Sequence, residues 1–178
     1  TTPTVVNASS GQSGYISHEY ALAGTYLVKV SGTMKAYKRV SYLDNLAGQD
    51  LLTHIRSFGK LGIESFMRAF TNCTGLISVP KYCPKSISNM ALMFQSCSGA
   101  AFNPDVSNWD VSNVDNMDEM FYDCSGAAFR GGRGTDGTGI ANWTPDSLTN
   151  AADFMLSSKK QEDGFLDSIL TAWAALIG

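Results

Sequence analysis

Histidine is scarce in the sequence, and its cysteines show no metal-binding spacing. His18 and His54 are the only histidines among 178 residues, and no two cysteines form a CxxC motif. Zinc sites need three or four clustered imidazole or thiolate ligands. The GxSxG, P-loop and HExxH motifs of hydrolases and nucleotide-binding enzymes are also missing. We therefore expect no catalytic residues, no metal site and no cofactor.

Positive charge and long apolar runs are scarce as well. The chain carries 13 Lys and Arg residues against 16 Asp and Glu residues, a net charge of −3. Because nucleic-acid-binding domains usually carry a basic excess, we expect no nucleic-acid partner. No apolar stretch reaches the roughly 20 residues that span a bilayer, and no signal-peptide pattern opens the chain. A start at the small Thr1 fits removal of an initiator Met, so we expect a complete product that is neither exported nor inserted in a membrane.

The four cysteines do not look like a disulfide framework. Cys73, Cys97 and Cys124 each follow a phenylalanine by three residues, in FTNC, FQSC and FYDC. A residue fixed to a repeated phrase is better explained as a small buried side chain. We predict that these three cysteines are stacked in the interior as free thiols.

One phrase recurs along the chain, which indicates a repeat architecture. SCSGAAF at Ser96–Phe102 returns as DCSGAAF at Asp123–Phe129. A second phrase appears as SFMRAF, NMALMF, NMDEMF and NAADFM, which gives four units. Between these phrases the apolar positions also agree: Val79, Val106 and Ile140; Tyr82, Trp109 and Trp143; Pro84, Val111 and Pro145; Ile87, Val114 and Leu148.

Each unit is predicted to contain a helical turn, a loop and a strand. The phrase NMxxMF places apolar residues at i, i+3 and i+4, as on one face of a helix. Asn89, Asn116 and Asn150 precede it, where a side-chain oxygen can cap the first amides. The Gly after each Cys would end the turn by adopting a positive φ. WDVSNV alternates apolar and polar residues, which is typical of a half-buried strand.

Such a unit cannot bury its apolar face alone, so the units are expected to stack. The predicted fold class is an α/β repeat, a short leucine-rich-repeat-like solenoid of about four units. One predicted column contains Phe70, Phe94, Phe121 and Met155. The other contains Tyr82, Trp109 and Trp143.

Two end segments are expected to flank the repeats. Residues 1–42 are predicted to be an N-terminal β-rich module, with a strand pair in Gly14–Gly32. Residues 43–178 would form the solenoid. Glu162–Gly178 would be its C-terminal capping helix, and no linker separates the two parts. The apolar face of that helix would hold Phe165, Ile169, Ala172, Trp173 and Leu176.

The phrases MFYDCSGAAF, NPDVSNWDVSNVDNMDEMF and FLDSILTAWA resemble the BspA-type leucine-rich-repeat-like surface proteins, whose repeat reads roughly MF..C..FN.D.S.WD.S.V..M..MF. The resemblance covers about Ser65–Gly178. Upstream, SHEYALAGTYLVKVSG is similar to the end of a PKD-type β module, without its usual Trp-Gly-Asp-Gly stretch. The family implies surface display and adhesion or partner recognition, with no catalytic residues. Similar repeats also occur in phage virion proteins.

Candidate partner-binding residues lie where the repeat tolerates insertions. The segment after each Cys lengthens from TGLIS to SGAAFNPD to SGAAFRGGRGTDGTG, and insertions at one repeat phase lie on one face. Arg130, Arg133 and Asp136 are the only charges in Arg130–Gly139, so we take them as candidate contacts. An unselected surface loop is the alternative. Asp110 and Asn113 on the predicted strand face are the next candidates.

Three function classes remain: a phage virion protein, a bacterial cell-surface adhesin and an enzyme. The enzyme class lacks a nucleophile, base or metal constellation. An adhesin needs a signal peptide or an anchor. We therefore expect a non-enzymatic structural or interaction protein on a virion surface, as a capsid decoration or tail-fibre component. It would bind a capsid, tail or host-surface protein, as a single copy or a homo-oligomer. A cell-surface or secreted adhesin module is the alternative.

Overall fold

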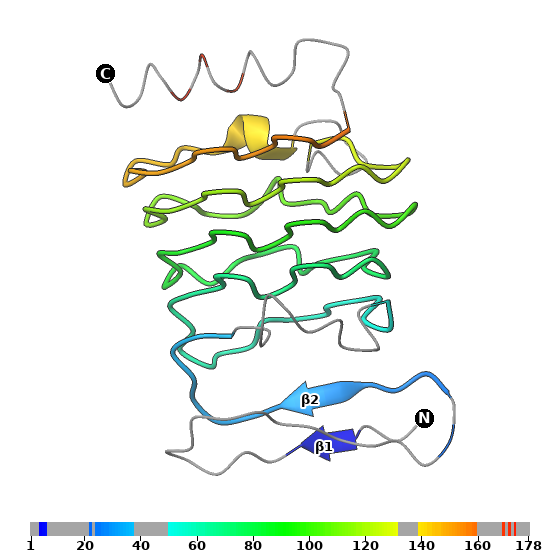
Figure 1. Cartoon of the computed structure of the whole chain (residues 1–178). Helices are drawn as coiled ribbons and strands as arrows, with labels where there is room; N and C mark the ends of the chain where they lie inside the picture. The colour runs from blue at the N-terminus through cyan, green and yellow to red at the C-terminus, as the bar shows by residue number, and fades with distance from the viewer. Residues whose placement is uncertain are drawn as a thin grey trace.

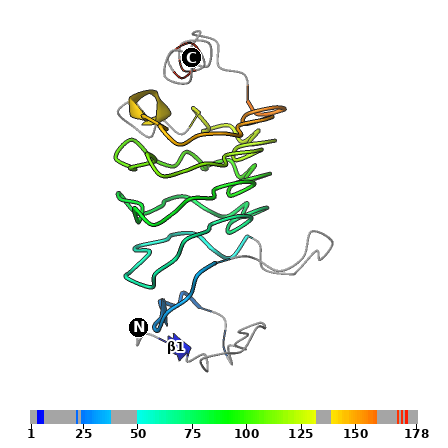
Figure 2. The same cartoon turned by 90° about the vertical axis from the view of Figure 1, so that its left-hand side faces the viewer.

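The computed structural model describes residues 4–6, 22, 24–37, 50–131, 139–159, 169, 171 and 173. Three elements have defined bounds: strand β1 (Thr4–Val6), strand β2 (Val28–Val30) and the 3₁₀ helix η1 (Gly139–Asn142). β1 and β2 pair in parallel, with Thr4 opposite Val28. Residues 50–131 and 139–159 wind through irregular coils that lie one above another in sequence order (Figures 1 and 2).

The predicted fold class is wrong. In the described part of the chain no α-helix has defined bounds, and the only sheet consists of two three-residue strands. An α/β leucine-rich-repeat-like solenoid with a helical cap is therefore not what forms. Most of the predicted cap at Glu162–Gly178 lies outside the described residues. Ile169, Thr171 and Trp173 are described there and have helical backbone.

Left-handed residues explain why the predicted helical turns are absent. Glu119 and Asp123 have φ angles of 50° and 53°, and they lie three and seven residues after Asn116. A left-handed residue ends a right-handed helix, because its positive φ is incompatible with the negative φ that the i to i−4 hydrogen bonds require. The i, i+3, i+4 spacing instead comes from successive tight turns. In one of these the Met120 amide donates to the Met117 carbonyl at 3.1 Å. The same two repeat positions are left-handed in the other units, at Arg68, Asn72, Leu92, Ser96, Asp153 and Ser157.

Between these turns, every second amide points to the neighbouring coil. We call the four equivalent stretches the ladder segments: Ser65–Cys73, Asn89–Cys97, Asn116–Cys124 and Asn150–Ser158. Between the second and third, the amides of Met90, Leu92 and Phe94 donate to carbonyls of the next coil at 2.8–2.9 Å. Parallel bridges join Ser65, Asn89, Asn116 and Asn150 in order. The backbone is therefore satisfied partly within a coil and partly between coils.

The predicted asparagine caps bind backbone amides, but in turns rather than at a helix start. Asn89 Oδ1 accepts a hydrogen bond from the Ala91 amide at 2.9 Å. Asn116 and Asn150 make the same bond to Asp118 and Ala152. Asparagine side chains stabilise turns in this way, by bonding to the backbone two residues on.

The first predicted aromatic column is present. Phe70, Phe94 and Phe121 stack with ring centroids 5.8 Å and 5.5 Å apart, and all are at most 3 % exposed. The last member differs from the prediction. Met155 is buried in register with Phe121, but the ring that contacts Phe121 is that of Phe154, at 5.5 Å.

The second column is only partly as predicted. Trp109 and Trp143 are both 3 % exposed and stack with ring centroids 6.5 Å apart. Trp143 in turn stacks on Trp173 at 6.3 Å. Tyr82 was expected to continue this column, but it is 64 % exposed. Phe58 contacts Trp109 instead, with ring centroids 5.9 Å apart, and so takes the place expected for Tyr82.

The glycine of each CTG or CSG phrase allows neighbouring coils to approach closely. A Cβ on Gly99 would lie 1.8 Å from the Thr74 carbonyl oxygen, and one on Gly126 would lie 2.1 Å from the Gly99 carbonyl oxygen. Neither glycine has a positive φ, so the predicted reason for its presence is wrong. These positions need glycine because no side chain fits between the coils.

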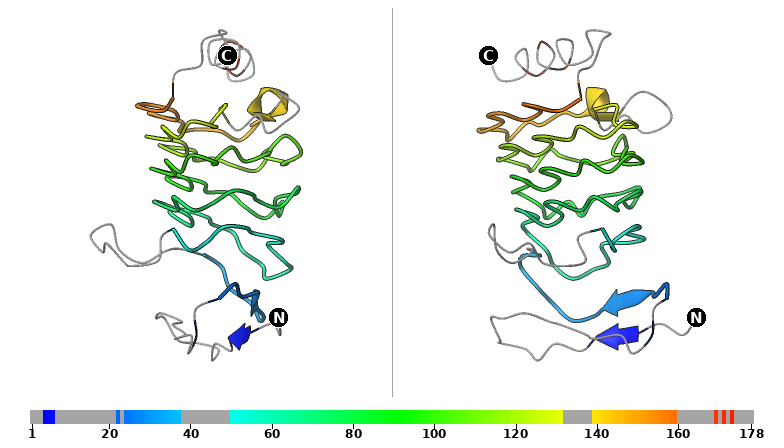
Figure 3. Two further views of the ribbon diagram at one scale, coloured as in Figure 1. Left: turned by 90° about the vertical axis from the view of Figure 1, so that its right-hand side faces the viewer. Right: turned by 45° about the vertical axis from the view of Figure 1, so that its right-hand side comes forward.

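The stack also extends one coil further toward the N-terminus than the four predicted units. His54 bridges to Ser78, and Ala36 bridges to Ser65, both in parallel. Phe58 and Ile63 are buried in the same core cluster as the later units. The successive coils follow the same order in both views of Figure 3.

Candidate partner-binding site

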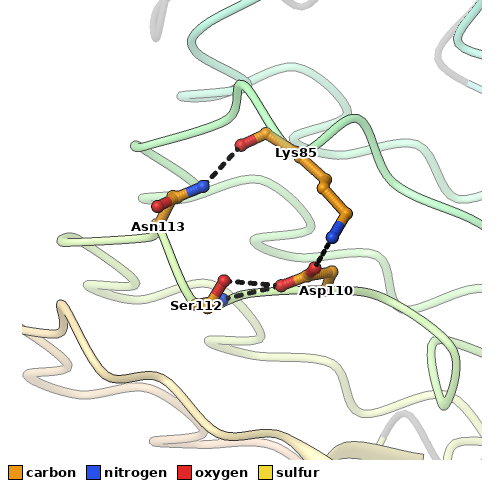
Figure 4. A network of polar contacts seen from close by, with 4 residues as sticks. All are labelled: Lys85, Asp110, Ser112 and Asn113. Atoms are coloured by element: carbon orange, nitrogen blue, oxygen red, sulfur yellow. Dashed lines mark hydrogen bonds and ion pairs between the residues drawn. The ribbon is translucent and has the colours of Figure 1, made fainter.

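A polar network joins two neighbouring coils at the surface (Figure 4). Lys85 Nζ lies 2.8 Å from Asp110 Oδ2. The hydroxyl and the amide of Ser112 both donate to Asp110 Oδ1, at 2.7 Å and 3.2 Å. Asn113 Nδ2 donates to the Lys85 carbonyl at 3.0 Å. Asp110 and Asn113, both predicted contact residues, therefore meet in one network with Lys85.

This network controls the charge state of its carboxylate. The hydrogen bond from Lys85, together with the two hydrogen bonds from Ser112, lowers the pKa of Asp110 to about 2. The same bond raises the pKa of Lys85. Both groups are consequently charged across the whole neutral range. The side chains of Lys85 and Asp110 are 81 % and 37 % exposed, so the pair faces water.

The second group of predicted contact residues lies elsewhere in the sequence repeat. The Arg130 guanidinium donates to the carbonyls of Ala127 and Phe129 at 3.0 Å and 2.9 Å. The Arg130 amide donates to Asn103 Oδ1 at 3.0 Å. The guanidinium thus binds the backbone of its own loop. Arg133 and Asp136 lie outside the described residues.

Next to the network the surface is hollowed into a cleft of about 540 Å³. Two stretches line it: residues 56–63 of one coil, and residues 80–84 with Ser86 of the next. We call this the basic cleft, because its lining contains Arg56, Lys60 and Lys81 and no Asp or Glu. The Lys85 backbone lies between Pro84 and Ser86, so the basic cleft is contiguous with the polar network.

Tyr82 lines the basic cleft with an aromatic ring, and Cys83 lines it with a buried thiol. Lys81 Nζ lies 5.5 Å from the centre of the Tyr82 ring. Cys83 is 8 % exposed, and burial raises its thiol pKa to about 12, with a further contribution from the Asp110 charge. A thiol with so high a pKa is a poor nucleophile at neutral pH. The basic cleft therefore offers charge and an aromatic surface.

Residues 64–162 match the family described as "Mycoplasma protein of unknown function, DUF285". The chain belongs to this family. No curated protein and no solved structure is detectably similar to it.

The part of the chain matched to DUF285 contains all four ladder segments and the whole polar network. The basic cleft straddles its boundary: Lys81 and Tyr82 lie within the matched residues, whereas Arg56 and Lys60 precede them. The cleft is therefore built from the DUF285 repeats together with the coil before them.

The cysteines of the DUF285 repeats are buried free thiols, as predicted. Cys97 Sγ donates to the Phe70 carbonyl at 3.1 Å, and Cys124 Sγ donates to the Phe94 carbonyl at 3.2 Å. Burial raises the pKa of Cys124 far above its ordinary value. In the last ladder segment Ser158 holds the same position, and its hydroxyl donates to the Phe121 carbonyl. These groups bind the neighbouring coil, and Cys97 and Cys124 are fully buried.

The described residues contain neither a metal-binding cluster nor a membrane-spanning helix. There, no group of three or more His, Cys, Asp or Glu side chains is placed to hold a metal ion. Within the same residues, no helix has the length and apolar character needed to cross a bilayer.

The sequence reasoning missed the basic cleft, although a signal for it was present. Lys81 and Lys85 stand at the repeat positions that Asn108 and Ser112 hold in the next unit. Two cations in place of two neutral polar residues mark the VPKYCPKS unit as different. Tyr82 was missed because its repeat position was assigned to the core.

Proposed function

We propose that the protein is a non-enzymatic recognition module displayed on a surface, and that it binds its partner through the polar network and the adjoining basic cleft. The single observation that supports this most strongly is the network itself. Lys85, Asp110 and Asn113 are exposed, yet hydrogen bonds across two coils hold them in fixed positions. Exposed polar groups that are already ordered lose less conformational entropy when a partner binds.

We further propose that this DUF285 chain is one of the BspA-type repeat proteins. The support is the recurring MF..C and S.WD.S.V phrases together with the DUF285 match over residues 64–162. That resemblance implies adhesion or partner recognition at a surface. The family description names a mycoplasma, which favours display on a bacterial cell. Display on a virion, as a capsid decoration or tail-fibre component, is the alternative.

Surface display is tested by immunogold labelling of intact cells and of purified virions with antibodies against residues 50–159. We expect gold particles on one of the two intact surfaces. Labelling that appears only after lysis would contradict display. The labelled surface also decides between the cell and the virion.

The contact residues are tested by competition for attachment. Added soluble protein should block attachment of the labelled cells or virions to their target surface. The double variant Asp110→Ala/Asn113→Ala should block it at least about tenfold less well, because it removes two ordered polar contacts. A matched control is Asn108→Ala, an exposed residue in the same unit whose side chain bonds only to Ser107. Equal competition by all three proteins would place the contact elsewhere.

The loop Arg130–Gly139 is the competing contact and needs its own variant. Replacing it with a short Gly/Ser linker removes Arg130, Arg133 and Asp136 together. Loop closure depends only weakly on composition and length, so the stack should fold. If this variant alone fails to compete, the loop is the contact and the polar network is not.

A further inference from the structure

The basic cleft concentrates positive charge in a chain that is acidic overall. Arg56, Lys60 and Lys81 line it without an accompanying carboxylate, although the whole chain has a net charge of −3. Within the described residues the salt bridges join Lys35 to Glu64 and Lys85 to Asp110, so none involves these three cations. Uncompensated cations around a concave surface create a local positive potential that attracts an anion.

The size and walls of the cleft fit a small organic ligand. Its volume of about 540 Å³ lies within the range of roughly 300–1,000 Å³ that is typical of such sites. Tyr82 is 64 % exposed, although its repeat position is buried in the next two units. An exposed aromatic ring offers a flat apolar surface with a polar tip. The C–H face of a sugar ring can pack against such a surface.

Positive φ angles set the shape of the wall opposite Tyr82. Gly59 and Gly62 have φ angles of 63° and 73°, so the chain turns sharply on both sides of Lys60 and Leu61. The Gly59 amide is satisfied by Ser57 Oγ at 3.0 Å, which stabilises the first of these turns. The Lys60 side chain is thus carried on a bonded turn that lines the cleft.

From these features we propose that the basic cleft binds an acidic carbohydrate, in which a carboxylate or sulfate meets Arg56, Lys60 and Lys81 and a sugar ring packs on Tyr82. The inference rests on the proposed surface-recognition function and names the ligand class of that surface. Arginine binds carboxylate and sulfate through two parallel N–H donors, and lysine adds a compact positive charge.

Two other anionic partner classes fit the cleft less well. Single-stranded nucleic acid uses a row of aromatic side chains along a basic groove, whereas this cleft has one exposed ring in a chain of net negative charge. Acidic peptide motifs are typically bound by a cluster of arginines, whereas Arg56 is the one arginine among the residues that line this cleft. Of the other apolar lining residues, Phe58, Ile63, Pro80 and Cys83 are buried, and Leu61 and Pro84 are half-buried.

The test is calorimetric titration of the purified chain with five probes at one fixed salt concentration. The probes are a heparin hexasaccharide, an oligogalacturonate, neutral dextran, poly-glutamate and an oligo-uridine RNA. We expect binding of heparin, which carries sulfate and carboxylate, or of oligogalacturonate, which carries carboxylate alone. The stronger of the two identifies the acidic group. Dextran, poly-glutamate and RNA should bind at least about tenfold more weakly.

Three variants separate the cleft from general charge attraction. The triple variant Arg56→Gln/Lys60→Gln/Lys81→Gln should weaken binding by about a hundredfold, and Tyr82→Ala should weaken it by about tenfold. Lys29→Gln, which removes an exposed cation on β2, should leave affinity unchanged. Circular dichroism of each variant verifies that the fold is kept. If Tyr82→Ala binds like the wild type, or if Lys29→Gln weakens binding as much as the triple variant, the specific cleft is refuted.

The remaining outcomes also decide the matter. No binding of either acidic carbohydrate overturns the proposal, and so does equal or tighter binding of poly-glutamate or RNA. Failure of the ligand assignment can be told apart from failure of the proposed function. If the triple variant competes for surface attachment as well as wild type while Asp110→Ala/Asn113→Ala does not, the recognition function stands and the carbohydrate site falls.

Discussion

The stretches Val79–Ser88 and Val106–Asp115 are consecutive copies of one repeat phrase, yet they use the same position in opposite ways. In the second copy Trp109 is 3 % exposed, stacks on Trp143, and donates from Nε1 to the Pro80 carbonyl at 2.9 Å. In the first copy Tyr82 is 64 % exposed and borders the basic cleft. The two copies occupy equivalent positions in the repeat, but the aromatic side chain belongs to the buried core in only the second copy.

The difference arises from the neighbouring coil. The Phe58 ring reaches Trp109 directly, with centroids 5.9 Å apart, so the column continues without Tyr82. Because the column does not need a side chain at this repeat position, the residue there can be exposed and can contact a partner. Lys81, Tyr82 and Lys85 all lie in this one unit.

Removal of the buried aromatic side chain of Trp109 should have the largest effect on the free energy of unfolding. Trp109→Ala should lower the free energy of unfolding by about 3–5 kcal/mol, because it deletes a buried ring and leaves a cavity. Urea denaturation followed by circular dichroism measures the change. The neighbouring exposed variant Asn108→Ala should stay within about 0.5 kcal/mol of wild type. A loss below about 1 kcal/mol for Trp109→Ala would contradict the buried column.

The close approach that all units share can be broken at one glycine. Gly99→Ala would place a methyl group 1.8 Å from the Thr74 carbonyl oxygen, so one coil must shift. We expect a loss of about 1–3 kcal/mol, as for overpacked cores, measured by the same denaturation. Ser98→Ala, an exposed change in the adjacent residue, should be nearly neutral. Equal stability of Gly99→Ala and wild type would show that the two coils are not in close contact at Gly99.

The reactivity of Cys83, the thiol of the first copy, can be compared with that of the three cysteines in the ladder segments. All four cysteines are buried, but Cys83 borders the basic cleft. A pKa raised from 9.0 to about 12 leaves about a thousandfold less thiolate at pH 8. We expect slow labelling of the native protein by iodoacetamide, with Cys83 modified first, and rapid labelling of all four thiols in urea. Mass spectrometry of digested samples gives the order, and early modification of Cys73, Cys97 or Cys124 would refute it.

The ion pair that connects the two copies should have the smallest effect on stability. Because Lys85 holds the pKa of Asp110 at about 2, below its ordinary 3.8, the pair stabilises the fold above pH 4 and loses this contribution as pH falls through 2. The pair is exposed to water, which screens the two charges, so its contribution to stability should be small. The Asp110 carboxyl should titrate near 2 by NMR in wild type and closer to 3.8 in Lys85→Gln. An unchanged midpoint in the variant would show that the pair does not form in solution.

The sequence sufficed to predict most of the buried repeat positions, with Tyr82 as the exception. The burial of Phe94 and Phe121 was predictable because apolar side chains recur at this position of each unit. The cysteines three residues later recur in the same way. Backbone conformation could not be predicted in the same way. Leu92 adopts a φ of 57°, which is unfavourable for a leucine, while its amide donates to the Asp118 carbonyl of the next coil at 2.8 Å. That hydrogen bond spans 26 residues and has no local signature.

Only part of the candidate site was predictable from the sequence. Asp110 and Asn113 were found as polar residues of an alternating phrase, and the structure brings them together with Lys85. The cleft depends on the coil containing Arg56 and Lys60, which carries no recognisable repeat phrase. Its position in the stack is set by contacts such as the His54–Ser78 bridge.

The central claim is that Tyr82 has been released from the core and serves recognition, and Tyr82→Ala tests it most directly when stability and binding are measured on the same preparation. We predict a free energy of unfolding within about 0.5 kcal/mol of wild type. Affinity for the heparin hexasaccharide or the oligogalacturonate should fall about tenfold. A loss of several kcal/mol with unchanged affinity would show that Tyr82 is a core residue like Trp109, and would contradict the claim.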